Sequence, residues 1–154
     1  MKRQFFTLLL LTGTLLLSGF SCHHVLKSDL PVIALKMEGH EIYVEVANKE
    51  ATRETGLMFR GEMEWDNGML FVFNDYAPRY FWMKNTLIPL SIAFIDDKGM
   101  ILNILEMPPQ TEQTFPSRGP ARFALEMNAG WFTKEGVKPG DGVEGVLKAP
   151  PAME

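Results

Sequence analysis

The clearest structural signal in this sequence is the segment Ile92-Ala93-Phe94-Ile95-Asp96-Asp97-Lys98-Gly99-Met100-Ile101-Leu102-Asn103-Ile104-Leu105. Two apolar runs, at 92–95 and 100–105, flank the polar sequence Asp96-Asp97-Lys98-Gly99. A short turn rich in aspartate and glycine between two apolar runs is typical of a β-hairpin. The sequence therefore predicts two antiparallel strands joined by this turn.

Other segments on both sides of the hairpin have the same short, apolar character. Further strands are predicted at 42–46, 69–73, 80–84, 122–127 and 143–147. Strands at a spacing of roughly 8–12 residues are typical of compact β folds. We therefore expect a mainly β fold, a compact antiparallel β-sandwich or barrel.

Two short helices and two loops complete the expected domain. Asn48 is expected to cap a helix over 49–58, and Asn128 a helix over 129–135. Loops are expected at 74–79 and at 108–120, where prolines and glycines interrupt the pattern.

The N-terminus has the pattern of a signal peptide. Lys2 and Arg3 precede an uncharged apolar run over residues 5–17. This run fits the roughly 7–15 residues of a signal-peptide core and is shorter than the roughly 20 that span a bilayer. An uncleaved N-terminal anchor is the alternative. The expected organisation is a signal peptide (1–21), a tether (22–30), a single β-sandwich domain (31–148) and a C-terminal tail (149–154).

Cys22 is the only cysteine and directly follows the predicted leader. Bacterial lipoproteins carry a lipid-modified cysteine at this place, so we expect Cys22 to be the lipid attachment site. Ordinary cleavage after Ser21 is the alternative, because Gly19 and Ser21 also satisfy the small-residue rule for signal cleavage. Either route predicts an exported protein, in the periplasm or at the cell surface, whose contact with a membrane is limited to an acyl anchor.

Composition excludes several classes of function. The formal net charge of −4 is unfavourable for nucleic acid, which requires a clustered basic surface. A single cysteine and three histidines do not provide a thiol nucleophile within the domain, a cysteine-based zinc site or an iron–sulfur cluster. We therefore expect no metal and no cofactor, and a monomer.

Polar residues interrupt several of the apolar runs. Long charged side chains are seldom buried without a partner, so their position in apolar sequence suggests a shared polar pocket. The hypothesis is a binding pocket beside two tryptophans, formed by Arg60, Trp82, Lys84, Asn85, Glu126, Asn128 and Trp131. The alternative is an ion pair between Lys84 and Glu126, with Asn128 acting only as a helix cap.

Four strings of sequence together resemble a known family. They are Gly56-Leu57-Met58-Phe59-Arg60, Gly68-Met69-Leu70-Phe71-Val72-Phe73, Phe81-Trp82-Met83-Lys84-Asn85-Thr86-Leu87-Ile88-Pro89-Leu90 and Leu125-Glu126-Met127-Asn128-Ala129-Gly130-Trp131. They resemble the prokaryotic domain-of-unknown-function family 192, over roughly residues 42–143. The resemblance implies a small, exported or anchored, mainly β domain, and no reaction. Many relatives carry a cysteine pair in the loop that corresponds to 108–120; this chain has none there, so we expect that loop to be more mobile.

The favoured function is a non-enzymatic binding or interaction module of the cell envelope, with an unidentified envelope ligand or protein as its partner. One alternative is a metal-independent hydrolase or lyase that acts on an envelope glycan through Glu126 and Lys84. Glu106 and Glu126 as a glycosidase-type acid and base are a weaker form of this idea. Another alternative is a structural lipoprotein without a ligand. A strongly perturbed carboxyl pKa would favour the enzyme.

Overall fold

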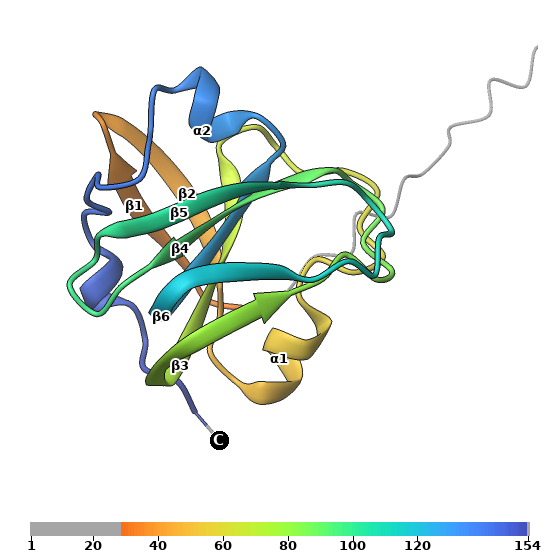
Figure 1. Cartoon of the computed structure of the whole chain (residues 1–154), viewed down its shortest axis with the longest axis horizontal. Coiled ribbons are helices and arrows are strands. Elements are labelled where there is room, and N and C mark those ends of the chain that lie inside the picture. Colours follow the sequence, from red (N-terminus) through yellow and green to blue (C-terminus); the bar gives the residue numbers. More distant parts are fainter. Residues whose placement is uncertain (1–28, 154) are drawn as a thin grey trace, which may run out of the picture.

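The computed structural model describes residues 29–153, in which six strands form one mixed sheet (Figure 1). The order across the sheet is β1-β2-β3-β6-β4-β5. The strands are β1 (Val32–Met37), β2 (His40–Ala47), β3 (Asn67–Phe81), β4 (Leu90–Ile95), β5 (Ile101–Met107) and β6 (Phe115–Asn128). The remaining elements are α1 (Glu50–Thr55), α2 (Trp131–Lys134) and a 3-10 turn, η1 (Val146–Lys148).

The predicted mainly β class with two short helices is confirmed. Four strand pairs are antiparallel, and β2 pairs with β3 in parallel. The sheet is not closed into a barrel. None of the helices within 29–153 is long and apolar enough to cross a bilayer. The predicted signal peptide (1–21), Cys22 and most of the predicted tether lie outside the described residues.

The predicted hairpin forms as β4 and β5. The Asp96 side chain accepts hydrogen bonds from the backbone N–H groups of Lys98 (2.9 Å) and Met100 (2.8 Å). Gly99 takes a φ of +84°, which a residue with a Cβ rarely adopts. The aspartate and the glycine therefore fix the turn for separate physical reasons.

The loop predicted at 74–79 is wrong and the one predicted at 108–120 is right only in its first half, because the other residues form parts of long strands. Residues 74–79 belong to β3, and the second half of the 108–120 segment belongs to β6. The pairing between these strands is irregular from Val72 to Ala77, and Pro78 lies opposite Pro120. Prolines are tolerated there because irregular pairing leaves positions that require no backbone donor. In Figure 1 both strands change direction at the lower left, and their outer halves (green and cyan) run side by side.

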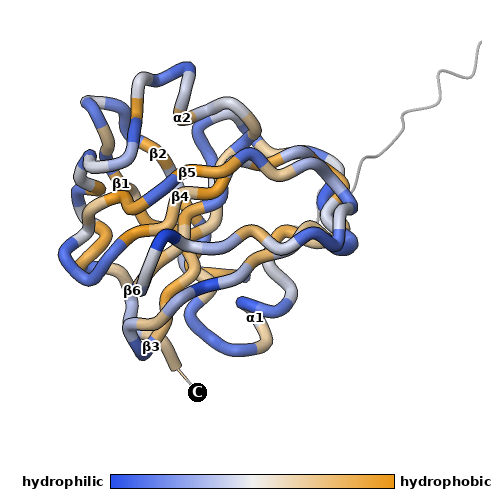
Figure 2. Tube along the Cα trace, viewed as in Figure 1, coloured by the Kyte–Doolittle hydropathy of each residue, from blue (hydrophilic) through white to orange (hydrophobic). Residues whose placement is uncertain are grey.

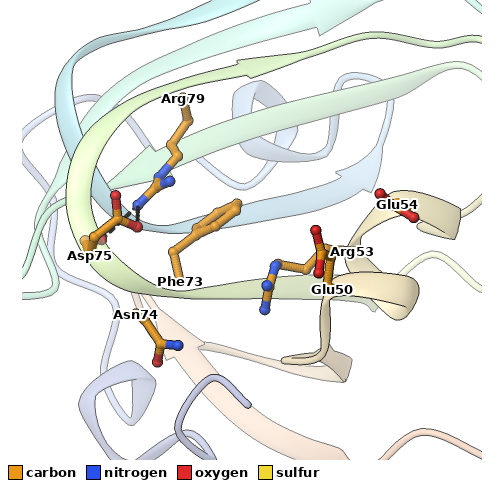
Figure 3. A pocket seen from close by; sticks show the side chains of 7 residues that line it. All are labelled: Glu50, Arg53, Glu54, Phe73, Asn74, Asp75 and Arg79. Atoms are coloured by element: carbon orange, nitrogen blue, oxygen red, sulfur yellow. Dashed lines mark hydrogen bonds and ion pairs between the residues drawn. The ribbon is translucent and has the colours of Figure 1, made fainter. Parts of the chain in front are cut away.

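An arginine holds this bend in β3. The Arg79 guanidinium lies 3.9 Å from the centre of the Phe73 ring and donates hydrogen bonds to the carbonyl oxygen and the carboxylate of Asp75, both at 2.6 Å (Figure 3). It also donates to the carbonyl oxygen of Ala121 on β6, at 3.1 Å. The hydrogen bond from Arg79 to the Asp75 carboxylate lowers the pKa of that carboxyl. The arginine therefore links both strands at the point where they turn.

Both faces of the sheet are buried, and Figure 2 shows apolar residues concentrated along the central strands. One face packs against α2 and the C-terminal segment, with Trp131 and Phe132 at its centre. The other face is covered by the bent ribbon of β3 and β6 and by the loops after α1 and β3. Phe81 of the ribbon packs edge-on against Phe71 (4.9 Å between ring centres) and Phe94 (5.6 Å).

Both helices are shorter than predicted, and neither has the predicted cap. Lys49 precedes α1, and the side chain of Asn48 instead donates a hydrogen bond to the carbonyl oxygen of Pro151 (2.8 Å). Gly130 precedes α2. Asparagine is favoured at helix starts because its side chain bonds to backbone groups, and here that capacity serves long-range contacts instead.

The predicted strand at 143–147 is also wrong. Gly145 has a φ of +90°, so the chain turns there into η1. Before that turn, the C-terminal segment forms isolated bridges with both edges of the sheet, Glu144 with Lys36 and Gly142 with Met100. The end of the chain is held as well, since the backbone N–H of Met153 donates to the carbonyl oxygen of Asn48 (2.6 Å).

Gly68 provides a test of the packing between β3 and β6. A Cβ at this position would collide with the carbonyl oxygen of Glu126 on the neighbouring strand. We expect Gly68→Ala to lower the free energy of unfolding by about 1–3 kcal/mol, measured by chemical denaturation. Gly61→Ala is the control, because nothing lies within 4 Å of the Cβ it would add. Equal stability of both variants would contradict this packing.

Candidate functional site

Glu126 is the only ionisable side chain among residues 29–153 that is fully buried, with 4% of its surface exposed. It lies near the C-terminal end of β6, between Met69 of β3 and Ile92 of β4 in the strand register. Side chains of residues paired across strands point to the same face of a sheet, so Glu126 is surrounded by the apolar face that the bent ribbon covers.

The carboxyl of Glu126 has no hydrogen-bond or ion-pair partner among residues 29–153. Every fully enclosed side-chain nitrogen or oxygen in this part of the chain does have a partner. The oxygens of Glu126 must therefore border open space. Burial disfavours the charged form and raises the pKa of this carboxyl from 4.5 to about 8, so at neutral pH the group is mainly protonated.

That open space is a cavity of about 40 Å³, which we name the Glu126 cavity. Its walls are residues 53–58, from α1 and the turn after it, together with Phe71, Phe81, Trp82 and Thr86. Trp82 is half-exposed and forms part of the opening. A cavity of this size holds about three water molecules or one small polar group of a ligand.

Backbone hydrogen bonds hold together the two loops that cover this face. The N–H of Phe59 donates to the carbonyl oxygen of Asn85 (2.9 Å), and both residues have a positive φ, 64° and 58°. The N–H of Met83 donates to the carbonyl oxygen of Thr111 (3.0 Å), which joins the second loop to the connection between β5 and β6. A positive φ is uncommon outside glycine, so this junction is a strained, specific conformation.

Trp82 and Glu126 are the two predicted binding residues that line the cavity. Lys84 does not line the cavity, but its Nζ lies 5.2 Å from the centre of the ring of Trp82, which does. No ion pair joins Lys84 to Glu126 in the part of the chain that the structure describes, so that predicted pair is wrong. Asn85 is exposed and takes part through its backbone carbonyl.

Arg60 lies near the cavity but is bound elsewhere. Its guanidinium donates two hydrogen bonds to the carboxylate of Glu45, at 2.5 and 2.7 Å. Glu45 is the strand neighbour of Met69, which in turn pairs with Glu126, so all three side chains share one face. This ion pair satisfies Glu45, whereas the carboxyl of Glu126 has no such partner.

Two predicted residues lie apart from the cavity. Asn128 donates hydrogen bonds to the carbonyl oxygens of Glu64 (2.8 Å) and Trp65 (3.3 Å). Trp131 is fully buried in the core on the opposite face, where its indole N–H donates to Asp66 (3.1 Å). Asn128 is a structural link and Trp131 is a core residue; neither reaches the cavity.

The proposed pairing of Glu106 with Glu126 is also excluded. Glu106 is the strand neighbour of Ser91, whose hydroxyl donates to it at 2.7 Å. Ser91 directly precedes Ile92, the neighbour of Glu126, and successive residues of a strand point to opposite faces. Glu106 and Glu126 therefore lie on opposite sides of the sheet.

Sequence reasoning missed most of the cavity wall. Thr86 follows Lys84 and Asn85 in the family string at 81–90, and this position is the one indication in the sequence that a missed residue lies at the site. Residues 53–58 are predicted as part of the helix over 49–58, and Phe71 and Phe81 as residues of two strands. Their role depends on the bend of β3 and on the loop junction, which no local pattern indicates.

A larger surface cavity, of about 560 Å³, lies between α1 and the bend of β3 (Figure 3). Its two arginines are already bonded within the chain. Arg79 holds the bend, and Arg53 donates to the carbonyl oxygens of Asn48 (2.9 Å) and Val72 (3.2 Å). Residues 29–153 contain no group of three His, Cys, Asp or Glu side chains placed to hold a metal ion. The Glu126 cavity is therefore the better candidate.

The raised pKa of Glu126 predicts a specific dependence of stability on pH. The folded state binds a proton that the unfolded chain releases above pH 4.5, so the carboxyl destabilises the fold progressively between pH 4.5 and about 8. Glu126→Gln removes this effect. We expect its stability, relative to the natural protein, to rise by roughly 1.4 kcal/mol per pH unit across that window. Thermal unfolding at pH 4 to 9 measures it, and parallel curves for the two proteins would contradict a buried neutral carboxyl.

Comparisons with known proteins agree with this description. The model of DUF192, described as an uncharacterized ACR, matches residues 33–145. A crystal structure of a proposed transcription regulator from Sinorhizobium meliloti 1021 has 38% identity and a TM-score of 0.74, covering 77% of this chain and 96% of that one. A protein of unknown function from Novosphingobium aromaticivorans DSM 12444 has 37% identity and a TM-score of 0.74, covering 79% and 89%. No curated protein matches. The chain belongs to the DUF192 family.

Proposed function

We propose that this protein is an exported binding module of the cell envelope, which recognises a ligand or an exposed group of a partner at the Glu126 cavity. The observation that carries the proposal is a buried carboxyl without a partner, facing a small cavity beside a half-exposed tryptophan. Burying a polar group without a hydrogen bond costs free energy, and such groups gather at functional sites. A bound ligand would supply the missing partner.

The surface around the cavity supports a binding role. Phe59, Trp82 and Leu87 expose 61%, 48% and 47% of their surface, and they stand on the two loops joined by the hydrogen bond from Phe59 to Asn85. Exposed apolar side chains beside a polar cavity are typical of ligand and protein contacts. Trp82 offers both a flat apolar ring and an indole donor.

A specific observation also favours a second candidate function. A carboxyl with a pKa of about 8 is protonated at neutral pH and so could act as a general acid on an envelope glycan. The nearest carboxylate on the same face is Glu45, about 10 Å away at two strand spacings. Met69 lies between them and Arg60 binds Glu45, so Glu45 is not a free base. Glu54 of α1 lines the same cavity and is the carboxylate that this second function would use. We keep binding as the first proposal, because the unpartnered carboxyl and the exposed apolar rim both support it.

Export is proposed from the sequence alone, on the basic start, the apolar run at 5–17 and the position of Cys22.

The relative described as a proposed transcription regulator raises the question of whether this chain binds DNA. A net charge of −4 is unfavourable for a phosphate-binding surface, so we do not extend that role to this chain.

Trp82→Ala tests the binding function, with Tyr80→Ala as the matched control. Tyr80 is 68% exposed and precedes the loop, but it does not line the cavity. Thermal unfolding of the full-length protein is screened against wall fragments, sugars, nucleotides and divalent metals. A ligand at 100 times its Kd should stabilise the protein by roughly 2.7 kcal/mol, or several degrees. We expect Trp82→Ala to abolish the shift and Tyr80→Ala to keep it. No shift with any ligand would favour the structural lipoprotein instead.

Lipid attachment at Cys22 has its own test. When the full chain is expressed in bacteria and extracted from the membrane, its intact mass should exceed that of the polypeptide from Cys22 onward by the mass of a lipid group. Cys22→Ser should abolish this increase and release the protein into the soluble fraction. An unmodified thiol at Cys22 in the natural protein would contradict the lipid anchor. The proposed binding role of the Glu126 cavity would still stand.

A further inference from the structure

We infer that the Glu126 cavity binds a primary ammonium group at the end of an unbranched chain of its ligand. This inference rests on the proposed binding function and adds the chemical class of the group that is recognised. Three features carry it, namely the uncompensated carboxyl of Glu126, the aromatic wall and the size of the cavity. Together they favour a compact cation with an apolar stem.

Among the charged groups around the cavity, Glu126 is the buried one, and its carboxyl has no partner among residues 29–153. Arg53 and Glu54 of α1 both line the wall and have opposite charges, and the Arg53 guanidinium is bonded to two backbone carbonyl oxygens. Glu45, on the same sheet face, is bound by Arg60. No ionised neighbour contributes to the pKa shift of Glu126; burial alone causes it. An ammonium group that enters the cavity can therefore pair with Glu126 without displacing a cation already bonded to it, and Glu54 adds a second acidic side chain to the wall.

The wall of the cavity also favours a cation. Phe71, Phe81 and Trp82 line it, and the negative face of an aromatic ring attracts an ammonium group. The chain itself contains an example, since the ammonium of Lys84 lies 5.2 Å from the centre of the Trp82 ring. A carboxylate combined with aromatic rings is complementary to an alkylammonium group, whose charge and methylene groups both need partners.

The small volume favours a compact charged group. About 40 Å³, the space of about three water molecules, accommodates an ammonium group with roughly one or two methylenes, and a primary ammonium is the most compact end of an organic cation. A primary ammonium can come from a lysine side chain of a peptide or from an ethanolamine lipid headgroup. Both sources have the same charged end on an unbranched chain, and the structure selects for that end.

Binding an ammonium group changes the protonation of the site. At pH 7 the Glu126 carboxyl carries a proton, and the incoming cation favours the carboxylate, so this proton is released to solvent as the ligand binds. The affinity should then rise by about 50-fold between pH 6 and pH 8, since an alkylammonium stays charged throughout this range. A neutral ligand that accepts a hydrogen bond from the protonated carboxyl would show the opposite trend.

Nuclear magnetic resonance of the three tryptophan indole N–H groups provides a sharp test. Trp82 lines the cavity, whereas the indoles of Trp65 and Trp131 donate to Glu135 and Asp66 outside it. The full-length protein is titrated with ethylammonium and, as the neutral counterpart, with ethanol, at pH 6, 7 and 8. We expect ethylammonium alone to shift the Trp82 signal, with affinity rising about 50-fold over this range.

Variants separate the ammonium inference from the wider binding function. Glu126→Gln should abolish ammonium binding, while unchanged Trp131 signals show that the variant is folded. Equal responses to ethanol and ethylammonium, or an affinity that falls as the pH rises, would overturn the ammonium inference and keep the binding site. No response of the Trp82 signal to either probe at any pH would overturn the ammonium inference. If the ligand screen by thermal unfolding also gave no shift, the binding function would be overturned as well. Where ethylammonium binds, comparing Nα-acetyl-lysine amide with phosphoethanolamine identifies a peptide or a lipid headgroup as the source.

Discussion

The structure depends on one constraint: a single sheet with two apolar faces must bury both. One face is covered by α2 and the C-terminal segment, as in many small β proteins. The other is covered by the sheet itself, because β3 and β6 bend and return across it. Arg79 makes this possible by stacking on Phe73 and bonding to Asp75 and Ala121 at the turn. The bend brings Phe81 onto the covered face and leaves Trp82 at its border, so the cavity is a direct product of it.

Within this apolar layer, Glu126 is an exception that weakens the fold above pH 4.5. A leucine or methionine at this position would fill the space without that cost, as Met69 and Ile92 do on either side. Residues that reduce stability in this way are commonly retained for function. The paired carboxylate of Glu45, one strand beyond Met69, shows how the same face holds an acidic residue when only structure is required.

The sequence predicted the mainly β class, the hairpin of β4 and β5 and the presence of two small helices, because all three depend on local patterns. It failed where contacts distant in sequence override those patterns. Pro78 and Pro120 suggested loops, yet they face each other in a long irregular ribbon. Asn48 and Asn128 suggested helix caps, yet each is bonded to a segment more than sixty residues away. At the site, Glu126 is identified in the sequence as a polar residue within an apolar run and Trp82 as a tryptophan beside the polar residues, whereas Trp131 cannot be distinguished from a core residue without its neighbours.

The contacts of the C-terminal segment with both edges of the sheet have a consequence for self-association. Unpaired strand edges are templates for pairing with other copies of a chain, and proteins protect them. Here Lys36 of β1 and Met100, just before β5, form bridges with Glu144 and Gly142. During synthesis these edges stay open until almost the whole chain has been made. A chain truncated before Gly142 would keep its central strands and lose this protection, so it should aggregate through its edges rather than simply unfold.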